Sequence, residues 1–337
     1  MSPTILLLVS LVVLFLGGEL LVRGSVSLAL KMKISALVVG MTIVAAGTGA
    51  PEVFVSVQAI LQGSSSISLG NVIGSNIINI TFILGITAII YRIKISKQTL
   101  SLNYPVMLGA FVLLGGVLYF FKGIPVGVGV LFVMIFILFT WFLIATSRKE
   151  QLKAEIMQDE LSEVTIQDSL LKSIVMLVFS IVLLKFGAKW LVESAGTLAK
   201  NFGISDRIIG VTIVAVGTSI PELVTTVIAA LKKENDIAIG NLIGSNIFNI
   251  LGVLGIAASL REINIDDPAI FSFDYFWMLG VALVFGFLIY MFSKQEISRK
   301  HGIFLVLIYL FYIYKTLVKV FNNLLINYYS LPAFVIV

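Results

Sequence analysis

Two glutamates lie inside apolar stretches where a membrane-spanning helix normally carries no acid. Glu52 follows Gly-Thr-Gly-Ala-Pro at 47–51, and Glu222 follows Gly-Thr-Ser-Ile-Pro at 217–221. A carboxylate at membrane depth is costly, so such acids usually line an ion path or pair with a base. Because the apolar stretches around both acids hold no Lys or Arg in their interiors, the sequence favours an ion path over a structural ion pair.

A proline directly precedes each acid. Neither Pro51 nor Pro221 can donate a hydrogen bond to the carbonyl four residues back. Together with the adjacent glycines, this predicts a helix break with freed carbonyls at 45–47 and at 215–217. Irregular backbone at membrane depth is a known way to build a cation site.

Small polar residues recur at helical spacing around the acids. Each acid follows a threonine by four residues, so the two share a helix face. Two further stripes have i, i+4, i+8 spacing: Asn71, Ser75 and Asn79, and Asn241, Ser245 and Asn249. Such residues can serve only as helix–helix contacts, but two matched stripes, each after a Pro-Glu break, favour a shared polar site.

The predicted site offers carboxylates, hydroxyls, amide oxygens and carbonyls, all hard oxygen ligands. Ca²⁺ takes six to eight such ligands in flexible geometry, whereas Mg²⁺ requires a tight octahedron. Two negative charges match one divalent ion or a small number of Na⁺. One acid pair cannot serve both cargoes fully at once, so competition would itself couple them.

The acid motifs belong to a long internal repeat with an offset of 170 residues, as from Glu52 to Glu222. From Ile34 to Ile80 against Ile204 to Ile250 no gap is needed, and about half the positions are identical. A repeat of this length indicates two copies of one structural unit.

Composition places the chain in a lipid bilayer. Of its 337 residues, 59% are hydrophobic and 12% charged, and the mean hydropathy is +1.08, whereas soluble domains carry about 25% charged residues. The net charge of +5 is spread over short loops, which does not suggest nucleic acid. With no cysteine and one histidine, His301, the chain is not expected to be an enzyme. No Walker A pattern for nucleotide binding occurs, so we expect the gradient of another ion to drive transport. No cofactor is expected.

The fold class predicted is an all-α membrane protein of ten transmembrane helices in two inverted five-helix repeats, with helices 2, 3, 7 and 8 broken around a central cation site. The spans expected are 4–30, 34–62, 69–91, 102–121, 124–147, 170–199, 204–231, 238–260, 270–293 and 302–321. Five spans per repeat put the second copy upside down in the membrane. Basic residues concentrate in the loops on one side, which predicts extracellular N- and C-termini.

Four units follow along the chain: a first repeat at 1–147, a cytoplasmic connector at 148–169, a second repeat at 170–321 and a tail at 322–337. The connector reads as a solvated link, and the tail has no predicted role. Two further intramembrane charge pairs, Glu19 with Arg23 and Lys189 with Glu193, are expected to be local i, i+4 ion pairs.

The two Gly-Thr-x-x-Pro-Glu segments, each followed by Gly-Asn-x-x-Gly-Ser-Asn, resemble the α-repeats of cation/calcium antiporters, most closely prokaryotic sodium/calcium exchangers. The resemblance covers essentially the whole chain. It implies a ten-helix electrogenic antiporter that exchanges Na⁺ for Ca²⁺ by alternating access, with long first and sixth helices that slide during the switch.

The resemblance also implies roles for residues on the matching positions. Glu52 and Glu222 would be the central Ca²⁺-binding acids and would also serve Na⁺, and Asn79 and Asn249 would face the centre of the cluster. Thr48 and Thr218 would add backbone oxygens. Flanking Na⁺ sites would use Ser75 and Ser245 with the carbonyls of Ala45 and Ala215, and Ser219 is a further implied ligand.

Three departures from the family bear on the coupling ion. Gly49 stands where many relatives, and this chain at Ser219, have serine, which removes one hydroxyl from a Na⁺ site. Asn249 stands where potassium-dependent relatives carry aspartate, which argues against K⁺ co-transport. The Gly-Asn and Glu-His patterns of proton/calcium exchangers are absent around the first acid, which favours Na⁺ over H⁺.

The function expected is therefore Na⁺/Ca²⁺ exchange in the cell membrane, with Ca²⁺, Na⁺ and the lipid bilayer as partners. No obligate protein partner is expected, so we expect a monomer. H⁺/Ca²⁺ exchange on the same fold is the alternative. A cation channel is a rival from another class, in which current would persist without a counter-ion.

Overall fold

The chain folds into a bundle of helices with two pairs of very short strands. The computed structural model describes residues 2–157, 169–201, 215–292 and 296–329. The elements, with π-helical segments labelled η, are α1 (Pro3–Met32), α2 (Ala36–Val39), η1 (Gly40–Val44), α3 (Ala45–Thr48), α4 (Ala50–Leu61), α5 (Ser65–Ile78), η2 (Asn79–Ile83), α6 (Leu84–Ile90), β1 (Ile93–Lys94), η3 (Thr99–Asn103), α7 (Tyr104–Phe121), β2 (Gly123–Ile124), α8 (Val126–Met157), α9 (Leu170–Asn201), α11 (Ala215–Gly217), α12 (Ile220–Leu231), α13 (Asn235–Ile247), η5 (Phe248–Leu254), α14 (Gly255–Leu260), β3 (Ile263–Asn264), η6 (Ile270–Tyr275), α15 (Phe276–Phe287), η7 (Leu288–Phe292), β4 (Glu296–Ile297) and α16 (Arg299–Tyr329).

The described helices make this a multi-pass membrane protein. Seven of them are long and apolar enough to span a bilayer, or eight if one bent pair counts as a single span. Every predicted span overlaps a helix, but the described part of the seventh is short, with the 12-residue α12 as its main helix. Its beginning, 204–214, lies outside the described residues, so the structure does not test the count of ten.

The structure confirms a predicted helix break in the second span but not in the third or the eighth. The second span bends by 46° between Ala36–Thr48 and Ala50–Leu61. The prediction that helices 3 and 8 are broken is wrong: Ser65–Ile90 and Asn235–Leu260 each run as one span and contain a π-helical segment, η2 or η5. Single π-turns inside α-helices are frequent at functional sites, and sequence periodicity did not reveal them.

Equivalent residues of the two halves contact each other reciprocally. The Tyr104 hydroxyl donates to the Ala282 carbonyl at 3.0 Å, and the Tyr275 hydroxyl donates to the Phe111 carbonyl at 3.1 Å. The strands follow the same pattern, since β1 pairs with β4 and β2 with β3, both antiparallel. Such exchange of partners is the mark of a two-fold axis between two like units.

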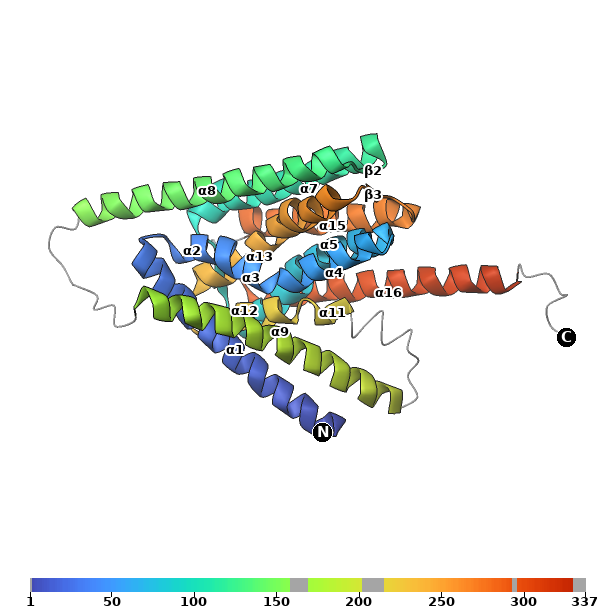
Figure 1. Cartoon of the computed structure of the whole chain (residues 1–337), viewed down its shortest axis with the longest axis horizontal. Coiled ribbons are helices and arrows are strands. Elements are labelled where there is room, and N and C mark those ends of the chain that lie inside the picture. Colours follow the sequence, from blue (N-terminus) through green and yellow to red (C-terminus); the bar gives the residue numbers. More distant parts are fainter. Residues whose placement is uncertain (1, 158–168, 202–214, 293–295, 330–337) are drawn as a thin grey trace.

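The long helices α1 and α9 lie side by side and run in opposite directions. Gly17 packs against Leu184 and Gly187 against Leu14. As the number rises along one helix it falls along the other, so the two are antiparallel. In Figure 1 this pair lies on one side of the bundle and α7 and α8 on the other, with α4, α5, α12 and α13 between them.

The α1–α9 pair does not sit symmetrically on the core. Helix α1 packs along α12, where Gly18 meets Val224 and Ile228, while α9 makes much sparser contact with α4. On the close side an ion pair joins Glu19 to Lys232. The prediction that Glu19 pairs with Arg23 is therefore wrong: Lys232, the residue directly after α12, reaches Glu19.

The other predicted pair, Lys189 with Glu193, is present at 3.7 Å. Two helices extend beyond the predicted repeats. Helix α8 continues through the start of the connector to Met157, and α16 continues into the tail to Tyr329. Residues 158–168 and 330–337 lie outside the described part of the chain.

Glycines allow α13 to cross the first half at backbone contact. A Cβ on Gly240 would lie 2.6 Å from the Leu37 carbonyl oxygen, and one on Gly244 would lie 2.5 Å from Met41 Cα. Small residues at such crossings are typical of membrane helix packing. The approach buries Asn235–Leu260 along its most apolar stretch.

We expect Gly244→Ala to lower the thermal unfolding temperature in detergent, because the added methyl group meets backbone atoms that cannot rotate away. Overpacking of this kind costs about 1–3 kcal/mol. Gly109→Ala is the matched control: Gly109 is exposed, and a Cβ there meets no atom within 4 Å. Equal unfolding temperatures for the two variants would show that this crossing does not require glycine.

Candidate cation site

Both acids lie in the first turn of a helix that begins after a break. The residue before each helix leaves helical geometry in nearly the same way, with φ −79° and ψ 4° at Gly49 and φ −90° and ψ 6° at Ser219. Proline is the second residue of both α4 and α12, where its missing N–H disturbs no helical bond. Glu52 and Glu222 follow directly and are 1% and 2% exposed.

The carbonyls near the break are only partly as predicted. The Gly49 N–H donates to the Ala45 carbonyl at 3.0 Å, so that carbonyl is not freed. In the second half, the Ser219 N–H donates instead to Val216 at 3.1 Å, one residue nearer than the helical partner Ala215. The two breaks therefore present different backbone oxygens, although their sequences are similar.

The structure brings the two acids together, and hydroxyls from both halves surround them. The Glu52 carboxyl lies near that of Glu222, and Thr218 and Ser75 lie against it. Thr48 lies against Glu222. The threonine of each half therefore faces the acid of the other half, rather than only the acid four residues along its own chain.

Several buried oxygens in this cluster have no hydrogen-bond partner among the described residues. They are Glu52 Oε2, Glu222 Oε2, Asn79 Oδ1, Asn249 Oδ1, Thr218 Oγ1, Ser219 Oγ and Ser245 Oγ. A buried polar atom without a partner costs about 1–3 kcal/mol, and these seven oxygens come from both halves of the chain. A hard cation would satisfy carboxylate, amide and hydroxyl oxygens together.

Asn76 and Asn246, which sequence analysis did not assign to the site, accept hydrogen bonds from the assigned residues Asn249 and Asn79. Asn79 Nδ2 donates to Asn246 Oδ1 at 3.5 Å, and Asn249 Nδ2 donates to Asn76 Oδ1 at 3.4 Å. Because each amide donates through its nitrogen, its oxygen stays available. Asn76 and Asn246 close the Gly-Ser-Asn motif of the repeat, and that position was the signal for them.

The first asparagine of each stripe belongs to the scaffold. Asn71 donates to Ser56 at 3.1 Å and Asn241 donates to Thr226 at 3.0 Å. Asn241 also accepts from the Thr48 hydroxyl at 3.3 Å. These bonds tie α5 to α4 and α13 to α12, and so fix the two acid-bearing helices against the helices that carry Ser75 and Ser245.

A ring occupies the place of the hydroxyl that is missing at Gly49. A Cβ on Gly49 would lie 2.9 Å from Phe248 Cδ1. In the repeat, Gly49 corresponds to Ser219 and Phe248 to Ile78. The small residue and the large one therefore complement each other across the halves, and the oxygen cluster is richer on the Ser219 side.

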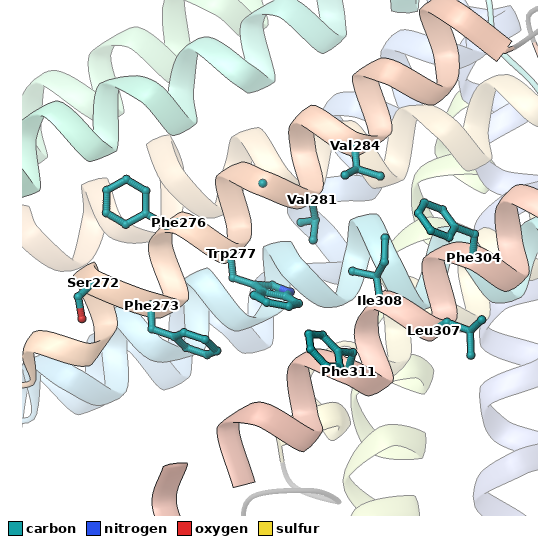
Figure 2. A pocket seen from close by; sticks show the side chains of 11 residues that line it. Ser272, Phe273, Phe276, Trp277, Val281, Val284, Phe304, Leu307, Ile308 and Phe311 are labelled. Atoms are coloured by element: carbon teal, nitrogen blue, oxygen red, sulfur yellow. The ribbon is translucent and has the colours of Figure 1, made fainter. Parts of the chain in front are cut away.

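The larger apolar cavities lie away from the acids. Figure 2 shows one of about 630 Å³ between α15 and α16, lined by aromatic and aliphatic side chains such as Phe273, Trp277 and Phe311. A smaller cavity of about 170 Å³ lies beside the site, where Thr48, Pro51 and Pro221 contribute to its wall.

The described residues contain no group of three or more His, Cys, Asp or Glu side chains that could hold a metal, so a cation here would depend on two acids and neutral oxygens.

Comparison with known proteins gives one consistent result. The profile of the family described as "Sodium/calcium exchanger protein" matches residues 2–145 and 172–318. The chain is similar to the putative antiporter CaxA of Alkalimonas amylolytica, with 34% identity over 92% of this chain and 97% of that one. It is also similar to the sodium/calcium exchanger MaX1 of Methanosarcina acetivorans, with 31% identity over 90% and 95%. Among solved structures, the sodium-calcium exchanger NCX_Mj superposes with a TM-score of 0.78 at 28% identity, covering 92% of this chain and 97% of that one.

We expect Gly49→Ser alone to lower the unfolding temperature, because its Cβ meets the Phe248 ring, at a cost of about 1–3 kcal/mol. Adding Phe248→Ile, the residue type at the equivalent position 78, should recover part of that loss. A double-mutant cycle of thermal unfolding in detergent measures the coupling. Strictly additive effects would mean that the two positions do not complement each other.

Proposed function

Because the chain belongs to the sodium/calcium exchanger protein family, we propose that it is a secondary active transporter that exchanges Na⁺ for Ca²⁺ by alternating access and normally extrudes Ca²⁺. The observation that carries this proposal is the cluster of two buried carboxyls and unpaired neutral oxygens drawn from both halves of the chain. The cargo crosses the membrane chemically unchanged, so the protein is not an enzyme and uses no cofactor.

We infer that the architecture is ten transmembrane helices in two inverted five-helix repeats, 1–147 and 170–321, with 148–169 connecting them and 322–337 following. The reciprocal contacts between halves and the antiparallel α1 and α9 support this division. An inverted pair of repeats supplies the two related arrangements that alternating access requires.

Ca²⁺ would bind between Glu52 and Glu222, where two negative charges balance the ion. Thr48 and Thr218 would add oxygens, and Asn79 and Asn249 would face the centre of the cluster. Na⁺ would bind at the flanks through Ser75, Ser245, Ser219 and the carbonyls of Ala45 and Ala215. The Ala45 carbonyl already accepts from the Gly49 N–H, so it would bind Na⁺ through its second lone pair. Because Gly49 has no hydroxyl, the flank on its side would hold Na⁺ with fewer protein oxygens.

The proposed location is the cell membrane, with both termini extracellular. The support is the concentration of basic residues in the loops between predicted spans on one side. The cluster is formed within one chain, so a monomer suffices for the proposed transport.

H⁺/Ca²⁺ exchange is the second candidate, because a pair of buried carboxyls can be neutralised by protons as well as by metal cations. The absence of the proton-exchanger patterns around Glu52 argues for Na⁺. The two candidates differ in which gradient drives Ca²⁺ uptake.

We expect purified protein in liposomes loaded with Na⁺ to accumulate radioactive Ca²⁺ after dilution into Na⁺-free buffer. Liposomes loaded with K⁺ or with acid at equal osmolarity are the controls. Uptake driven by the acid gradient without Na⁺ would select the proton exchanger. Ca²⁺ flux that persists with no counter-ion gradient would select a channel.

We expect Glu52→Gln and Glu222→Gln each to reduce Na⁺-driven Ca²⁺ uptake by at least about 100-fold, since removing one partner of a buried ion pair costs about 3–5 kcal/mol. Both variants should also lose the rise in unfolding temperature that Ca²⁺ gives by binding to the folded state. Glu193→Gln is the control, because Glu193 is a half-exposed acid paired with Lys189. Full Ca²⁺ uptake by either site variant would show that the substituted acid is not part of the cation site.

A further inference from the structure

Lys185 places a positive charge within a membrane span, and this charge has no partner among the described residues. It lies in the span Leu170–Ser194, is exposed, and makes no ion pair or hydrogen bond with any described residue. Its neighbour one turn away, Lys189, pairs with Glu193. The equivalent position in α1 is Phe15, so the charge is not part of the repeat. Ionisable side chains at such depth usually face a water-filled path.

Lys185 shares a cavity with the candidate cation site. The 170 Å³ cavity is lined on the α9 side by Ile181, Leu184 and Lys185, which at i, i+3 and i+4 form one helix face. The opposite wall includes Thr48 and Pro51 from the first break and Pro221 from the second. Each proline is adjacent to one of the two acids, so the cavity abuts both acid-bearing turns.

The cavity lies on the loosely packed side of the α1–α9 pair. On the other side, α1 packs tightly along α12 and the Glu19–Lys232 ion pair joins them. On the cavity side, α9 makes only sparse contact with α4. An ion could therefore reach the acids past Lys185 with less rearrangement than past α1.

We propose that Lys185 is a selectivity-determining residue that weakens Ca²⁺ binding from this side relative to Na⁺ binding. The proposal rests on the proposed exchange of these two ions. A fixed positive charge raises the energy of a bound cation in proportion to the charge of that cation. If the charge lowers the binding constant of one Na⁺ by a given factor, it therefore lowers the binding constant of one Ca²⁺ by the square of that factor.

The test measures Ca²⁺ and Na⁺ affinities of the full-length protein in detergent, by calorimetric titration of Ca²⁺ and by Na⁺ competition against it. For Lys185→Gln we expect the half-saturating concentration to fall roughly threefold for Na⁺ and roughly tenfold for Ca²⁺, as the square relation requires. Lys185→Arg keeps the charge and should stay within about twofold of the unmodified protein. Lys189→Gln is the matched control, because Lys189 lies on the same helix but outside the cavity lining.

Two results would overturn the inference while leaving the proposed function intact. An unchanged ratio of Ca²⁺ to Na⁺ affinity in Lys185→Gln would mean that the lysine only extends toward the membrane surface. Equal effects of Lys185→Arg and Lys185→Gln would mean that packing, not charge, matters. If the unmodified protein neither binds Ca²⁺ nor exchanges it for Na⁺, the proposed function fails and this inference with it.

Discussion

The structure depends on one constraint: two carboxyl groups are buried next to each other in a protein that spans a membrane. Neither Glu52 nor Glu222 has a basic side chain on the surrounding broken helices, and each keeps one oxygen without a partner. Such a pair is tolerable only where a cation or protons can neutralise it. The helix breaks, the crossed threonines and the paired asparagines all serve to hold oxygens around that point.

The two halves stabilise this arrangement by supplying each other's partners. Thr48 faces the acid of the second half and Thr218 the acid of the first, and the amides of Asn79 and Asn249 are held by asparagines of the opposite half. Neither half could orient its own oxygens alone. A shift of one half against the other would therefore change the coordination of any bound ion directly, which links ion binding to conformation.

Sequence reasoning found the parts of this site that are encoded locally. The Pro-Glu motif predicted buried acids after a helix break, and the offset of 170 residues predicted that both would matter. It could not find what arises only from tertiary contact. The ion pair between Glu19 and Lys232 is such a contact, because it joins residues far apart in the chain. Sequence reasoning also missed local backbone detail: the π-helical turns at Asn79 and Phe248, and the hydrogen bond from the Gly49 N–H that keeps the Ala45 carbonyl engaged. Local spacing instead suggested a break, an i, i+4 pair and a free carbonyl.

The most informative features are those that break the symmetry of the repeat. A perfectly two-fold protein would treat the two sides of the membrane alike, yet an exchanger must hold one ion more weakly on the side where it is released. Three asymmetries distinguish the halves here: the Gly49–Phe248 pair against Ser219 and Ile78, the Glu19–Lys232 ion pair on one side of α1, and Lys185 where the equivalent residue is Phe15. Each changes charge, oxygen supply or packing on one side only. The symmetric contacts therefore build the cluster, and in the proposed exchange these few substitutions are the ones that would make its affinities differ between the two sides.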